Sequence, residues 1–161
     1  MKKKIWLGIF LLALLTACGF KPILSSKDNF DFSLEVTDAK GDNDLIKFIS
    51  LGLKKYQNSN ENIYYISINL DYIKEALSKN KSGKILEFKT ELITNVKINN
   101  KNNEKMISFT NTSNMTNTND NYDQKVYERN IKQNFANSII RNLLMEIVLF
   151  NDNQDKWDRL H

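Results

Sequence analysis

The sequence predicts an α+β fold, a two-layer sandwich in which an antiparallel four-stranded sheet carries two helices on one face, in the order β-α-β-β-β-α. Segments 30–37, 64–72 and 86–98 alternate apolar and polar residues, which is the pattern of half-buried strands. Segments 44–56 and 122–150 repeat apolar residues every three or four positions, which indicates amphipathic helices. Residues 30–150 are long enough to enclose a single core, and no internal repeat divides them.

The first strand and the first helix are joined by a turn at Gly41. Asp42 or Asn43 is placed to cap the helix, because short polar side chains accept hydrogen bonds from its first N–H groups. Gly52 weakens that helix by roughly 1 kcal/mol relative to Ala. The residues that form its apolar stripe are Leu45, Phe48, Ile49, Leu53 and Tyr56.

Three further strands follow, with a hairpin loop at 79–83 and a turn at 99–103. In segment 64–72 every second residue from Tyr64 is apolar and is expected to face the core. In segment 86–98 the residues expected to face inward are Leu86, Phe88, Leu92, Val96 and Ile98. Those expected to face outward are Glu87, Lys89, Glu91, Asn95 and Lys97. Segment 106–116 is rich in Thr and Ser, so it is predicted to be an exposed edge strand.

The last helix carries the strongest apolar pattern of the chain. Its predicted inner stripe consists of Val126, Phe135, Ile139, Leu143 and Ile147. Between residues 139 and 150 it is apolar nearly all round, so we expect it to be buried or to contact a partner. Residues 151–161 are expected to form a polar C-terminal tail.

The N-terminus reads as a secretory signal that is cleaved before the only cysteine. Three lysines at 2–4 precede an uncharged apolar run at 5–15, which is too short to span a bilayer because spanning takes about 20 apolar residues. The order Leu15-Thr16-Ala17-Cys18 resembles the bacterial lipobox, in which the cysteine is acylated, for example with palmitate. The chain thus divides into a signal peptide at 1–17, a lipid anchor and lead at 18–29, the domain at 30–150 and the tail.

Charge and residue types exclude several classes of function. Loss of the three signal-peptide lysines lowers the net charge from +4 to +1, so the mature domain does not suggest nucleic-acid binding. No second cysteine is present to pair with Cys18, and the only histidine is the terminal His161, so neither a disulfide nor a histidine-based triad or metal site is expected. The pattern from Ser78 to Lys81 matches S-x-x-K, but it lies in a hairpin loop without its companion motifs. We therefore expect no enzyme and no cofactor.

The segment Cys18-Gly19-Phe20-Lys21-Pro22-Ile23-Leu24 resembles the start of the lipopolysaccharide-assembly lipoprotein family LptE, in its short, divergent form. The lead from Ala136 into Arg141-Asn142-Leu143 also looks like the end of that family. The resemblance implies a two-layer sandwich and a structural role. Family members plug the outer-membrane barrel LptD, help it assemble and help deliver lipopolysaccharide to the cell surface.

The same resemblance implies an outer-membrane, periplasm-facing location in a Gram-negative envelope. Gly19 after the anchor fits that location, because Asp at this position is the usual retention signal. Candidate contacts to the barrel or to lipopolysaccharide are the outward and turn lysines Lys89, Lys97, Lys101 and Lys105. Two alternatives stay open: an interaction module of another envelope machine, such as a secretion or pilus channel, and a periplasmic enzyme with an unrecognised site.

Overall fold

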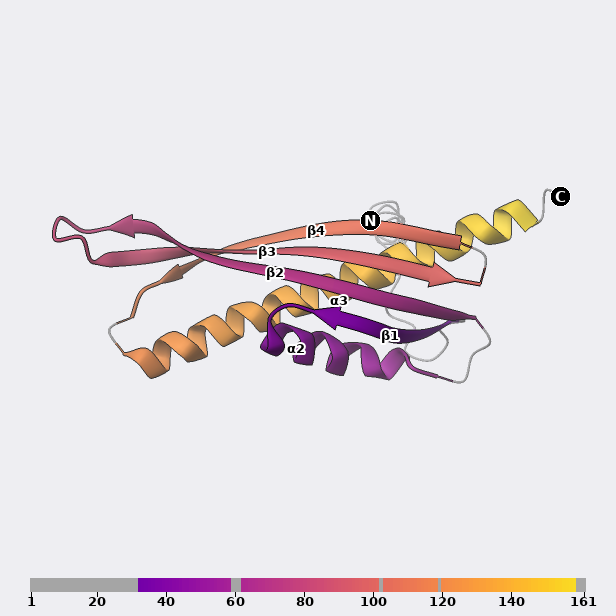
Figure 1. Ribbon diagram of the computed structural model, residues 1–161, viewed down its shortest axis with the longest axis horizontal. Coiled ribbons are helices and arrows are strands. Elements are labelled where there is room, and N and C mark those ends of the chain that lie inside the picture. The colour runs from indigo at the N-terminus through magenta and orange to yellow at the C-terminus, as the bar shows by residue number, and fades with distance from the viewer. Residues whose placement is uncertain (1–31, 59–61, 102, 119, 159–161) are drawn as a thin grey trace, which may run out of the picture. The chain divides into compact units, whose positions relative to one another are not determined.

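The computed structural model describes residues 32–58, 62–101, 103–118 and 120–158, with side chains described as far as residue 150. The signal peptide, Cys18 and the lead segment 18–29 lie outside the described residues. The elements follow the predicted order (Figure 1). They are β1 (Ser33–Lys40), α2 (Asn43–Leu53), the 3-10 turn η2 (Lys54–Tyr56), β2 (Ile63–Lys79), β3 (Ile85–Asn100), β4 (Asn103–Thr116) and α3 (Asn121–Asp158).

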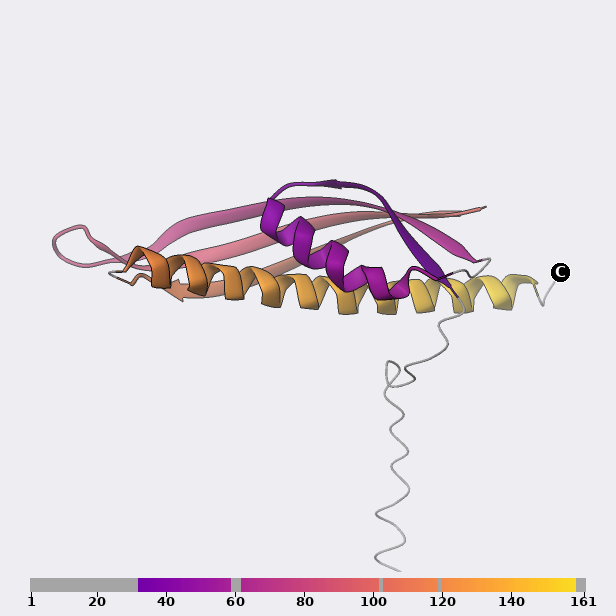
Figure 2. The ribbon, with the colours of Figure 1, turned by 90° about the horizontal axis from the view of Figure 1, so that it is seen from below.

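The four strands form one sheet in the order β1-β2-β3-β4, and both helices lie on one side of it, as predicted (Figure 2). The sheet is mixed, so the prediction of a wholly antiparallel sheet is wrong for one pair. β2 and β3, and β3 and β4, pair antiparallel, whereas β1 pairs with β2 in parallel. The cause is α2, which carries the chain back along the sheet before β2 begins, so that β2 starts at the same end as β1.

β2 and α3 extend well beyond their predicted ends. β2 and β3 form a long hairpin that reaches past the start of α3 in both views (Figures 1 and 2). α3 does not end near residue 150 but continues to Asp158, through most of the segment assigned to a polar tail. No proline or glycine interrupts residues 151–158, so the sequence contains no helix-breaking residue there.

The core lies between the helices and the inner face of the sheet. On α3 the predicted stripe is buried from residue 135 onward, and Ile139, Leu143 and Ile147 are each 0 % exposed. Two inward assignments are wrong. Val126 is 41 % exposed and Leu86 is 46 % exposed. Val126 lies in the second turn of α3, and Leu86 is the second residue of β3, next to the hairpin loop.

The two helices approach each other closely where α2 carries Gly52. A Cβ at this position would collide with Cδ1 of Ile140 on α3. Gly41, in the turn before α2, has φ +124°, and a Cβ there would collide with the backbone of Leu70 on β2. The side chain of Asp42 caps α2 as predicted, accepting from the N–H groups of Asp44 and Leu45.

Candidate functional site

The helix-free face of the sheet is a broad polar surface. Strand alternation and register place Ser67 and Asn69 of β2, Asn95 of β3, and Ser108 and Thr110 of β4 on this face. A depression of about 430 Å³ opens here. It is lined by Ser67, Asn69, Asn95, Val96, Lys97, Met106, Ile107 and Ser108. Hydroxyl and amide groups surround the depression, although more of its accessible lining is apolar than polar.

Two of the four candidate lysines lie on this face, and both are paired with carboxylates. Lys89 Nζ lies 2.6 Å from Glu91 Oε2, and Lys97 Nζ lies 2.8 Å from Glu104 Oε2. The hydrogen bond and charge of Glu91, with a smaller contribution from Glu75, raise the pKa of Lys89. Neither ammonium group is therefore an open site for an anion.

The other two candidates occupy different surroundings. Lys101 is exposed in the turn between β3 and β4. Its backbone N–H donates a hydrogen bond to Asn100 Oδ1 at 2.5 Å. Lys105 points to the helix face instead, where its Nζ lies 2.7 Å from Glu146 Oε2 on α3. The structure thus divides the four lysines among the helix-free face, the turn and the helix face.

The helix-free face as a whole carries more carboxylates than lysines. Register and alternation assign it four lysines, Lys40, Lys79, Lys89 and Lys97. The carboxylates on the same face are Glu35, Asp38, Asp71, Glu75, Glu87, Glu91 and Glu104. An anionic ligand gains no net attraction from such a surface, whereas a neutral or basic protein surface does.

The cluster of lysines that sequence reasoning missed lies at the tip of the β2–β3 hairpin. Lys79, Lys81 and Lys84 are all exposed, and no acidic residue occurs between residues 76 and 86. Asn80 holds the loop by accepting, through Oδ1, hydrogen bonds from the Ser82 N–H at 3.0 Å and the Lys84 N–H at 2.9 Å. The signal in the sequence is the spacing of these lysines without an intervening acid.

Exposed leucines flank this hairpin tip. Leu77 is 47 % exposed, and Leu86 lies across the hairpin with a similar exposure. A rigid loop that combines lysines with exposed leucines has the chemistry to contact a phosphate-bearing amphiphile. The hydroxyl of Ser78, by contrast, donates a hydrogen bond to Glu87 Oε2 at 3.3 Å.

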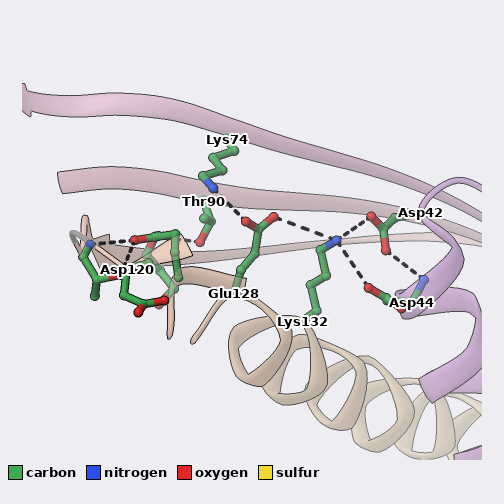
Figure 3. A network of polar contacts seen from close by, with 10 residues as sticks. Asp42, Asp44, Lys74, Thr90, Asp120, Glu128 and Lys132 are labelled. Carbon is green, nitrogen blue, oxygen red and sulfur yellow. Dashed lines mark hydrogen bonds and ion pairs between the residues drawn. The ribbon is translucent and has the colours of Figure 1, made fainter. Parts of the chain in front are cut away.

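A second polar group lies between the sheet and α3 (Figure 3). Lys132 of α3 is only 9 % exposed. Its Nζ lies 2.6 Å from Asp42 Oδ2 and 3.9 Å from Glu128 Oε1. The other carboxylate oxygen of Glu128, Oε2, lies 2.7 Å from the Nζ of Lys74 on β2. Burial alone would raise the pKa of Asp42, but the hydrogen bond and charge of Lys132 and two backbone N–H groups outweigh it and lower that pKa. Burial and then the Glu128 carboxylate raise the pKa of Tyr72. These charges are matched to one another, so the group ties α2, α3 and β2 together.

No family model and no curated protein matches the chain. The fold is similar to that of rare lipoprotein B from Shewanella oneidensis. That match has a TM-score of 0.55 at 9% sequence identity and covers 74% of this chain and 98% of the other. A second solved structure, an uncharacterized lipoprotein B from Nitrosomonas europaea, matches with a TM-score of 0.45 at 16% identity, covering 71% of this chain and 83% of that one. At these identities the likeness concerns the fold.

Two absences among the described residues bear on the site. Among them, no group of three or more His, Cys, Asp or Glu side chains could hold a metal ion. Within the same described ranges, no helix is long and apolar enough to cross a membrane. The exposed surfaces that the described sheet offers are the helix-free face, the hairpin tip and the strand edges.

Proposed function

We propose that the mature chain is a lipid-anchored outer-membrane lipoprotein that plugs the LptD barrel, helps it assemble and helps pass lipopolysaccharide to the cell surface. The observation that carries the proposal is the combination of the lipobox at Cys18 with the fold shared with rare lipoprotein B. The role is structural, without catalysis and without a cofactor.

The helix-free face is the surface we assign to the barrel. A barrel lumen is wet and polar, so the plug that fills it needs a polar rather than an apolar surface. This face meets that need through its hydroxyl and amide side chains, and its excess of carboxylates favours a neutral or basic lumen wall. Lys89 and Lys97 then contribute to partner contact as members of ion pairs.

Lipopolysaccharide is assigned to lysines away from that face. Its phosphates are anionic, and Lys81 at the hairpin tip and Lys101 in the turn are exposed cations outside the carboxylate-rich face. Lys105 is the weakest of the candidates, because Glu146 already occupies its ammonium group.

Site-specific photocrosslinking in living cells tests the proposal. Probes at positions 89 and 97 are expected to crosslink to a large outer-membrane barrel, and probes at 81 and 101 to lipopolysaccharide. A probe at position 47, exposed on α2, serves as the matched control on the helix layer. Absence of both products, together with normal surface lipopolysaccharide after depletion of the protein, would contradict the proposal and favour another envelope machine.

A further inference from the structure

The outer side of α2, turned away from the sheet, carries lysines around one exposed leucine. Lys47, Leu51 and Lys54 follow one another at intervals of four and three residues, so they share the side of the helix opposite its buried stripe. Lys55 comes next in η2, and all four side chains are exposed, Leu51 to 61 %. Asp44 is the only acidic residue in α2 and η2.

This surface continues onto α3. Gly52 of α2 packs against Ile140 of α3. The sequence neighbours of this pair, Leu51 and Arg141, are both exposed and flank the same contact. Met145 follows Arg141 by four residues, which places it one turn along the same side of α3, and it is 46 % exposed. We call this surface the helix-layer patch; it consists of Lys47, Leu51, Lys54, Lys55, Arg141 and Met145.

The four cations of the patch are not neutralised by carboxylates. Within the described ranges, none of them forms an ion pair, unlike the lysines of the helix-free face that pair with glutamates. Lys55 Nζ lies 4.9 Å from the centroid of the Tyr56 ring, a contact that leaves its charge in place. Asp44 lies 4.0 Å from Lys132 Nζ, so it is engaged between the layers. The patch therefore offers its positive charge to an anion.

The two sides of the domain thus differ in charge. The helix-free face has seven carboxylates and four lysines, whereas the helix-layer patch has four cations and no carboxylate among its members. These surfaces lie on the two opposite layers (Figure 2). In the field of an anionic surface, such a domain turns its helix layer toward that surface and its helix-free face away from it.

The described chain begins beside this patch. The side-chain amide of Asn58 donates to the carbonyl oxygen of Phe32 at 3.1 Å, and Asn58 comes three residues after Lys55. Residues 18–31 span at most about 50 Å, because an extended chain covers roughly 3.3–3.6 Å per residue. The membrane that holds the anchor expected at Cys18 is therefore within reach of the patch.

We infer that the helix-layer patch lies on the surface of an anionic phospholipid bilayer, with Leu51 between the headgroups and the lysines beside their phosphates. Lysine and arginine side chains are attracted to an anionic leaflet, and an apolar side chain among them gains by entering the interface. The anchor supplies attachment, and the patch determines which side of the domain faces the bilayer.

An acidic protein fits these observations less well than a bilayer does. It would match the charge of the patch, but it would account neither for Leu51 at the centre of the lysines nor for the entry of the chain beside them. The inference concerns the anchored chain without a barrel around it. It goes beyond the proposed function and does not depend on it.

The test uses the full lipidated chain reconstituted in vesicles without any barrel protein. The environment-sensitive fluorophore NBD is attached to Leu51→Cys, and in a second protein to Met106→Cys, a position 72 % exposed on the helix-free face. The vesicles contain phosphatidylglycerol and phosphatidylcholine in equal amounts, or phosphatidylcholine alone. We expect the fluorescence at position 51 to be about threefold higher on the anionic vesicles than on the neutral ones, and to fall back at high salt. The fluorescence at position 106 should be the same on both.

Charge reversal identifies the lysines responsible. The first variant replaces the three lysines of α2 and η2 by glutamate in the protein labelled at position 51, and it should abolish the increase. The matched control makes the same change of charge at three exposed lysines outside the patch: Lys81→Glu, Lys84→Glu and Lys101→Glu. It should keep the increase. All six positions are exposed, so unchanged melting temperatures would confirm that both variants fold.

Several results would overturn the inference. These are an equal increase at positions 51 and 106, an equal signal on neutral and anionic vesicles, and the same outcome in both charge-reversal variants. A response at position 51 to soluble polyglutamate but not to anionic vesicles would also overturn it, and would assign the patch to an acidic protein instead.

Discussion

The two halves of the layer between α3 and the sheet are held by different forces. From Phe135 to Ile147 the inner stripe of α3 is buried against apolar strand residues and α2. Nearer its start, α3 meets the sheet and α2 through the ion pairs of Glu128 and Lys132 (Figure 3). Apolar burial stabilises without regard to pH, whereas paired charges must offset their desolvation. The apolar half should therefore contribute most of the stability, and the charged half should set how the helices are placed.

The largest effect is expected in the apolar half. Leu143→Ala removes a side chain that is fully buried and should lower the free energy of unfolding by about 2–5 kcal/mol. Met145→Ala is the matched control two residues away, and it should change little because that side chain is half-exposed. Urea denaturation of both variants measures the difference. Equal losses would show that the face around Leu143 is not the core.

The charged half should respond less, but in a way that reveals its pairing. Lys132→Met leaves Asp42 and Glu128 facing each other without their shared cation, and should cost about 1–3 kcal/mol, less than a fully buried pair because Asp42 is partly exposed. Adding Asp42→Asn should recover part of the loss, since Asn still caps α2 and removes one charge. Non-additive losses in this double-mutant cycle are the expected sign of coupling. Strict additivity would contradict it.

The contact between Gly52 of α2 and Ile140 of α3 tests how tightly the apolar half is packed. Gly52→Ala improves helix propensity but drives a Cβ into Cδ1 of Ile140, so we expect a net loss of about 1 kcal/mol. Ile140→Val deletes that carbon, and in its background Gly52→Ala should become neutral or stabilising. Thermal melts of the four proteins in this cycle measure it. A stabilising Gly52→Ala in the original chain would mean that the two helices separate easily.

Much of the fold follows from periodicity, because a buried face imposes a period of two on strands and three to four on helices. The pattern found every strand, both helices and the cap at Asp42. It omitted Thr90 and Thr94, which are buried at 0 % exposure, from the inward side of β3, because a pattern of apolar residues does not include hydroxyl side chains. The parallel pairing of β1 depends on the path of α2, which no local pattern in β1 records.

The site was harder to predict than the fold. Lys105 resembles Lys97 in sequence, yet it lies on the opposite face of the sheet. In the β3–β4 pairing Lys105 is opposite Ile98, whose side chain faces the helices, whereas Lys97 faces away from them. Glu146, its partner, comes 41 residues later on α3. A long-range ion pair of this kind leaves no signal in the residues around either member.

The smallest predicted effect is the pH dependence of the charged half. Since the pKa of Asp42 is lowered in the folded chain, its contribution to stability is complete above the unfolded pKa of about 3.9 and is lost as the pH falls through the folded pKa. The difference in unfolding free energy between the original chain and Asp42→Asn should be constant from about pH 5 to 8 and shrink below about pH 4. The Leu143→Ala difference should stay flat over the same range, because no titrating group is removed. If both differences fell together on acidification, the two halves would not be held by different forces, and the division between burial and charge along α3 would fail.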